Sequence, residues 1–74
     1  MSRLPVISGS DAVKAFGKLG YVLDRQTGGH LILRNEALPH RRLTIPAHKT
    51  IAKGTLRALI REAGLTVEDF IDLL

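Results

Sequence analysis

The chain has 74 residues, of which 45% are hydrophobic. This is enough for one small folded domain and argues against a disordered chain. It contains no cysteine, which excludes disulfide bonds and thiolate metal sites. No apolar stretch approaches the ~20 residues of a membrane-spanning helix, and the N-terminus lacks the apolar segment of a signal peptide. We expect a single cytoplasmic domain over residues 1–74.

The basic side chains are concentrated in the middle of the sequence. Residues 25–61 hold eight of the eleven lysines and arginines and one acidic residue, whereas residues 62–74 hold four acidic residues and no basic one. A basic segment of this kind attracts the phosphate backbone of a nucleic acid or an acidic protein. A basic surface that only keeps the protein soluble is the alternative.

A first helix is predicted over residues 10–19. Ser8, Ser10 and Asp11 can accept hydrogen bonds from the free N–H groups of its first turn. Apolar residues then recur at helical spacing, and Gly20 follows as a glycine of the kind that ends helices.

Three short strands follow, because the spacing of apolar residues changes. They are predicted over residues 21–25, 30–34 and 41–45, with turns at 26–29 and 35–40 and with Pro46 ending the third strand. The short connections favour an antiparallel meander.

The second helix carries a single apolar stripe formed by Leu56, Leu59, Ile60 and Ala63. Gly64 ends it, and Thr66 begins a short last helix. We expect this last helix to bury Val67, Phe70, Ile71 and Leu74.

The order helix, three strands, helix and short helix predicts an α+β two-layer sandwich, with the helices on one face of the antiparallel sheet. Side chains alternate between the two faces of a strand, so one set faces the helices and the other faces the open side of the sheet. If the set that faces the helices is Leu31, Leu33, Leu43 and Ile45, the open face carries His30, Ile32, Arg34, Arg42 and Thr44. A one-residue error in register would reverse this assignment.

His30 follows a glycine pair, Gly28-Gly29, which leaves room for a large substrate to approach the backbone. Histidine can take and give a proton near neutral pH, and RNA supplies its own nucleophile, the 2′-hydroxyl. The pattern is therefore compatible with a general acid or base in RNA cleavage. An exposed turn histidine without a chemical role is the alternative.

His48 is a candidate for a second proton-transfer group or a phosphate contact, or else for a structural histidine that holds its loop. The candidates for holding phosphates are basic residues of the middle segment, namely Arg34, Arg42, Lys49, Lys53 and Arg57. The histidines lack a metal-ligand spacing, and no nucleotide-binding motif is present. We expect neither a metal nor a small-molecule cofactor.

Several short motifs, taken in their order and spacing, resemble the HicA (YcfA-like) toxins of bacterial and archaeal toxin–antitoxin pairs. They span nearly the whole chain: Leu4-Pro5, Ser8-Gly9, Lys18-Leu19-Gly20-Tyr21, Gly28-Gly29-His30, Ile45-Pro46-Ala47-His48, Lys53-Gly54-Thr55-Leu56-Arg57, Ala63-Gly64-Leu65, Glu68-Asp69-Phe70 and Leu73-Leu74.

This resemblance implies a fold like that of double-stranded-RNA-binding domains and an endoribonuclease that cleaves mRNA, with His30 as its catalytic residue. It also implies a HicB-type antitoxin that covers the active face. Gly29 stands where the family usually carries serine, a hydroxyl that could orient the histidine or touch a phosphate. The glycine makes the turn looser and is expected to lower activity.

The leading hypothesis is a metal-independent mRNA endonuclease acting on single-stranded or loosely structured RNA, which it contacts through Gly28, Gly29 and the basic candidates. A non-catalytic RNA-binding module on the same fold is one alternative. A basic domain that docks an acidic protein is another.

Overall fold

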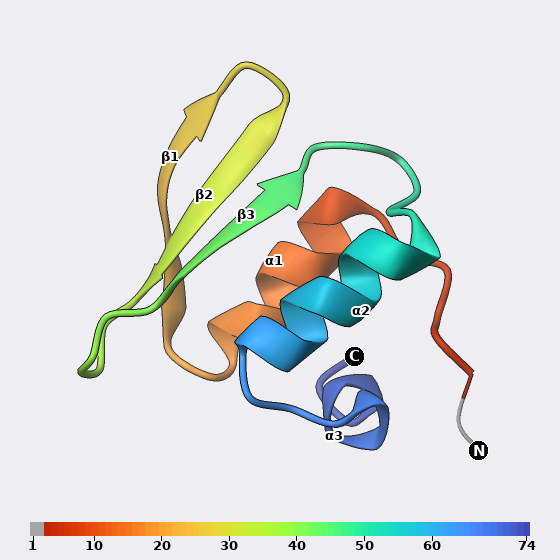
Figure 1. Ribbon diagram of the computed structural model, residues 1–74. Coiled ribbons are helices and arrows are strands. Elements are labelled where there is room, and N and C mark those ends of the chain that lie inside the picture. The colour runs from red at the N-terminus through yellow and green to blue at the C-terminus, as the bar shows by residue number, and fades with distance from the viewer. Residues whose placement is uncertain (1–2) are drawn as a thin grey trace.

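The computed structural model describes residues 3–74, so Met1 and Ser2 of the expected domain lie outside the described residues. The elements follow the order α1 (Gly9–Gly17), β1 (Tyr21–Thr27), β2 (His30–Asn35), β3 (Arg42–Pro46), α2 (Lys53–Glu62) and α3 (Val67–Ile71). Figure 1 shows the sheet on one side of the molecule and the helices on the other. The predicted α+β arrangement is confirmed.

The three strands form one antiparallel sheet in the order β1-β2-β3, as the meander prediction requires. The strand ends differ from the prediction. β1 continues to Thr27, so the turn narrows to two residues, and β3 runs one residue later than expected and includes Pro46. Pro46 is tolerated there because β3 is an edge strand, where a missing N–H breaks no ladder hydrogen bond.

The core lies between the sheet and the helices. Leu33, Leu43 and Ile45 are buried, and Leu31 packs against them half-buried. The helices contribute Ala12, Ala15, Phe16, Leu56, Leu59, Ile60 and Phe70. The predicted assignment of strand residues to the core is therefore confirmed.

Both predicted helix starts contain reciprocal hydrogen bonds, with Ser8 as the N-cap of α1 and Thr66 as the N-cap of α3. The Ser8 side chain accepts from the N–H of Asp11 at 3.1 Å, while the Asp11 carboxylate accepts from the N–H of Ser8 at 3.2 Å. Thr66 and Asp69 make the same pair of contacts at the start of α3. Each satisfies two N–H groups that the helix itself leaves free.

The predicted helix ends need correction. α1 ends at Gly17 rather than at residue 19, and the chain turns through Gly20, which adopts a left-handed φ of +94°. In the last helix Phe70 is buried and Val67 and Ile71 are half-buried, but Leu74 is 51% exposed. The expected burial of Leu74 is wrong because α3 ends at Ile71, so the helical spacing does not extend to it.

Gly9 is the point where α1 meets the chain that leaves β3. Its N–H donates to the carbonyl oxygen of His48 at 2.9 Å, and a Cβ built on Gly9 would collide with the carbonyl oxygen of Pro46. Only glycine allows this close approach of two backbones. The contact fixes α1 to the end of the sheet that carries His30, since Pro46 is the ladder partner of His30.

We predict that Gly9→Ala destabilises the protein by about 1–3 kcal/mol, because the added methyl group forces two backbones apart. Thermal unfolding followed by circular dichroism measures the effect. Gly17→Ala is the matched control in the same helix, since a Cβ built there would meet no other part of the described chain within 4 Å. This control should leave stability unchanged or raise it by about 0.5–1 kcal/mol. Equal stability of the two variants would contradict the close-approach argument.

Candidate functional site

The β1–β2 hairpin presents His30 directly after a two-residue turn. Gly28 has a φ of +55°, whereas Gly29 does not have a left-handed φ. A positive φ at the first turn position alone fits a type II′ turn. The carbonyl oxygen of Gly29 accepts from the N–H of Ala47 at 2.7 Å, so the turn is tied to the chain beyond β3. His30 thus sits at a fixed place with an exposed side chain.

The ladder register defines which side chains share the open face with His30. Its direct cross-strand partners are Thr27 on β1 and Pro46 on β3, and Arg25 and Thr44 are diagonal neighbours. Directly paired residues of an antiparallel sheet lie on the same face. Further along the same face lie Val22, Ile32, Arg34 and Arg42. None of these ladder-paired residues of the described strands is acidic.

Arg25 reaches this face because the two-residue turn pairs Thr27 with His30, and Arg25 lies two residues before Thr27, opposite Ile32. Beyond Arg25 the strand has a bulge: Asp24 has no partner, and Leu23 pairs with Leu33. Sequence reasoning missed Arg25 because the turn predicted over 26–29 is wider than the observed turn and does not pair Thr27 with His30. The residues of β1 give no local signal for the bulge.

Arg34 and Arg42 are directly opposite each other on β2 and β3. Like charges in this position repel and cost stability. Arg42 is exposed and Arg34 is half-buried, with Arg25 exposed on the neighbouring strand. The open face therefore gathers three guanidinium groups with no ladder-paired carboxylate to offset them, which suits it to binding a polyanion.

The remaining basic candidates lie in the helical layer rather than on the open face. Lys49 is in the loop after β3, Lys53 is the first residue of α2, and Arg57 follows one turn later. All three are exposed. The sheet thus places His30, Arg34 and Arg42 of the predicted site on one face, with the two arginines four residues along the ladder from the histidine, whereas Lys49, Lys53 and Arg57 lie outside this face.

The side chain of His48 also lies away from the open face that carries His30. It lines a hollow of about 230 Å³ together with Ser8, Ser10, Leu31, Ala47 and Lys49. Because Leu31 faces the helices, this hollow opens on the opposite side of the sheet from His30. The carbonyl oxygen of His48 also accepts the hydrogen bond from Gly9, so the backbone of His48 has a structural role.

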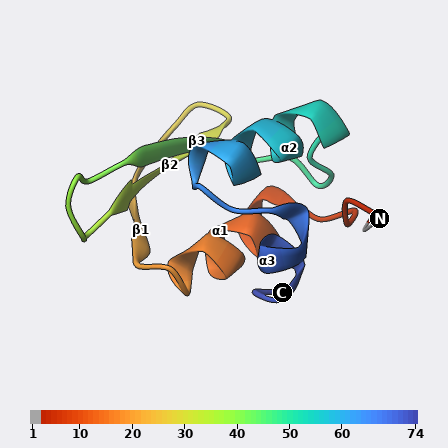
Figure 2. The ribbon, with the colours of Figure 1, turned by 60° about the horizontal axis from the view of Figure 1, so that its bottom comes forward.

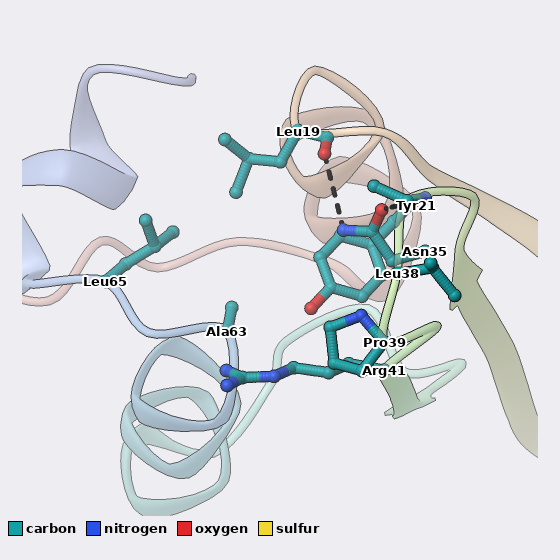
Figure 3. Close-up of a pocket in the computed structure, with 9 residues that line it drawn as sticks. Leu19, Tyr21, Asn35, Leu38, Pro39, Arg41, Ala63 and Leu65 are labelled. Carbon is teal, nitrogen blue, oxygen red and sulfur yellow. Dashed lines mark hydrogen bonds between the residues drawn. The ribbon is translucent and has the colours of Figure 1, made fainter.

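A second hollow, of about 280 Å³, lies at the other end of the sheet, close to Tyr21 and Asn35. Figure 3 shows it between Leu19, Leu38, Pro39 and Leu65, with the Asn35 side chain donating to the carbonyl oxygen of Leu19 at 3.4 Å. Its lining is mainly apolar and includes no histidine or carboxylate. It therefore lacks the histidine on which the predicted chemistry depends.

Two further features bear on the site. Within residues 3–74, no three histidine, cysteine or acidic side chains come together in a group that could hold a metal ion. None of the described helices is long and apolar enough to cross a bilayer.

A family model described as the HicA toxin of bacterial toxin–antitoxin systems matches residues 9–65, which include α1, the whole sheet and α2. No curated protein matches the chain.

We predict that Arg42→Thr stabilises the protein by about 0.2–1 kcal/mol in low salt, because it removes the like-charge pair with Arg34. Added sodium chloride should shrink the gain, since salt screens exposed charges. Thermal unfolding at low and high salt measures both effects. Arg61→Gln is the control, because it removes the same charge from α2 instead. An equal gain in the control would show that net charge, and not the pair, is responsible.

Proposed function

The chain belongs to the HicA toxin family of bacterial toxin–antitoxin systems, and we propose that it is a metal-independent endoribonuclease that cleaves mRNA in the cytoplasm. A toxin of such a pair works against a cognate antitoxin, which we propose is of the HicB type. The observation that supports nuclease activity best is the open face of the sheet, where one exposed histidine stands among arginines and no ladder-paired carboxylate is present.

RNA cleavage of this kind needs no cofactor. The 2′-oxygen attacks the adjacent phosphorus, a P–O2′ bond forms and the P–O5′ bond breaks, leaving a 2′,3′-cyclic phosphate and a free 5′-hydroxyl. One proton must leave the 2′-hydroxyl and one must reach the departing O5′. His30 is placed to transfer one of these protons as general acid or base, because its side chain is exposed beside the open glycine turn.

Binding in this proposal depends on phosphates more than on bases. The three aromatic side chains of the chain are Phe16, Tyr21 and Phe70, and all are buried, so none is available to stack on a base. Arg34 and Arg42 would contact the backbone on the open face, while Lys49, Lys53 and Arg57 extend the basic surface. Such binding is expected to weaken steeply with salt and to show little sequence preference.

A non-catalytic RNA-binding module remains a second candidate, and one observation favours it. The cleavage reaction moves two protons, but His30 is the one histidine among the ladder-paired residues of the described open face, and no carboxylate accompanies it. The same arginines would bind RNA without cleaving it.

We predict that induced wild-type protein arrests growth with cleavage of cellular mRNA, and that His30→Ala at matched protein levels does neither. Loss of the proton-transfer group should lower the cleavage rate by about 10²–10⁴-fold. Growth and total RNA are measured together. His48→Ala is the comparison, expected to retain much of the activity because its side chain lines the other side of the sheet. If the wild-type protein and the His30→Ala variant both arrest growth without RNA cleavage, the RNA-binding module is favoured.

We also predict that Gly29→Ser folds normally and raises the cleavage rate. Gly29 does not need a left-handed φ, and a Cβ built on it would have open space around it, so a serine fits and can offer its hydroxyl to a phosphate. Gly28→Ser is the matched comparison at the neighbouring position. It should lose about 1–2 kcal/mol of stability because Gly28 is left-handed. Unfolding curves and cleavage assays separate the two effects, and a slower Gly29→Ser enzyme would contradict the prediction.

A further inference from the structure

The arginines of the open face lie at different distances from His30. Arg34 is four residues away along β2, which is about 13 Å at the usual rise of ~3.3 Å per residue, and Arg42 is its direct partner on β3. Strand side chains stand roughly perpendicular to their sheet. The guanidinium groups of Arg34 and Arg42 therefore lie over the half of the face that is remote from the histidine.

Arg25 is much closer. Thr27 is the direct partner of His30, so Arg25, two residues earlier on β1, is its diagonal neighbour. Diagonal neighbours of this kind are separated by about 7–8 Å, within the reach of a long side chain. The ladder is regular from Arg25 to Thr27, since the bulge lies before Arg25. Of the open-face arginines, Arg25 is the one that can share a single phosphate group with His30.

Given the nuclease activity proposed above, we propose that Arg25 is a catalytic residue that binds the scissile phosphate. As the 2′-oxygen adds to phosphorus, negative charge grows on the non-bridging oxygens until the P–O5′ bond breaks. A guanidinium aimed at these oxygens stabilises that charge and itself exchanges no proton. His30 moves a proton at the same phosphate, while Arg34 and Arg42 hold a neighbouring part of the RNA strand.

The two-residue turn is what fixes this arrangement. It pairs Thr27 with His30, so regular alternation places Arg25 opposite Ile32 on the open face. The bulge at Asp24 lies beyond this stretch, and without it Asp24 would pair with the buried Leu33. The bulge therefore keeps a carboxylate from facing the core, while the turn keeps Arg25 beside the histidine.

The test separates cleavage from binding. Single-turnover cleavage of an end-labelled RNA is measured at saturating protein, and Kd is measured with the same sequence as DNA, which has no 2′-hydroxyl and stays intact. We expect Arg25→Gln to lower the saturating rate by about 10²-fold, the usual effect of removing one oxyanion donor, with Kd changed less than about threefold. Arg25→Lys should recover part of the rate. Arg34→Gln should weaken binding more than it slows cleavage.

Arg61→Gln is the charge-matched control, located at the end of α2, and should leave both quantities unchanged. Circular dichroism verifies that each variant folds, as expected for an exposed Arg25. If Arg25→Gln cleaves at the wild-type rate, or only weakens binding as Arg34→Gln does, the assignment is overturned and the nuclease proposal stands. If wild-type protein leaves RNA intact, both are overturned.

Discussion

The burial of one face of the sheet is the constraint on which the candidate site depends. Leu33, Leu43 and Ile45 are almost completely buried, and each contributes roughly 1.5–3 kcal/mol relative to an exposed side chain. A slip of one residue in register would expose all three and turn charged residues such as Arg34 toward the core. The same apolar contacts that stabilise the fold therefore hold His30 and the arginines on the opposite face.

Repulsion between like charges on the open face lowers the stability of the fold, and the buried core compensates for this loss. Arg34 and Arg42 repel each other across two strands, and nothing on the ladder-paired positions of that face neutralises them. A sequence selected for stability alone would place opposite charges or threonines there. Departures from local stability rules concentrate at functional sites, and a bound phosphate backbone would convert this repulsion into attraction.

Features determined by neighbouring residues could be predicted from the sequence, whereas features determined by contacts distant in sequence could not. Local patterns predicted the helix starts near Ser8 and at Thr66, a glycine-containing turn before His30, and which β2 and β3 residues face the helices. The bulge at Asp24 depends on how β1 registers with β2, and the close approach of Gly9 to Pro46 depends on how α1 crosses the end of the sheet. The sequence located His30 and Arg34 on one face but left Arg25 unassigned, because the turn predicted over 26–29 is wider than the two-residue turn that pairs Thr27 with His30.

The acidic residues of α3 lie on a different side of the molecule from the arginines of the open face. α3 carries Glu68 and Asp69 in its first turn, and its Phe70 packs against Phe16 of α1 with ring centroids 5.1 Å apart. Figure 2 shows α3 on the side of the helices away from the sheet. α3 therefore places acidic side chains on a different side of the molecule from the open face. The arginines of the open face attract a polyanion to the face where His30 is exposed, and because these charges are near the surface, salt weakens this attraction along with binding.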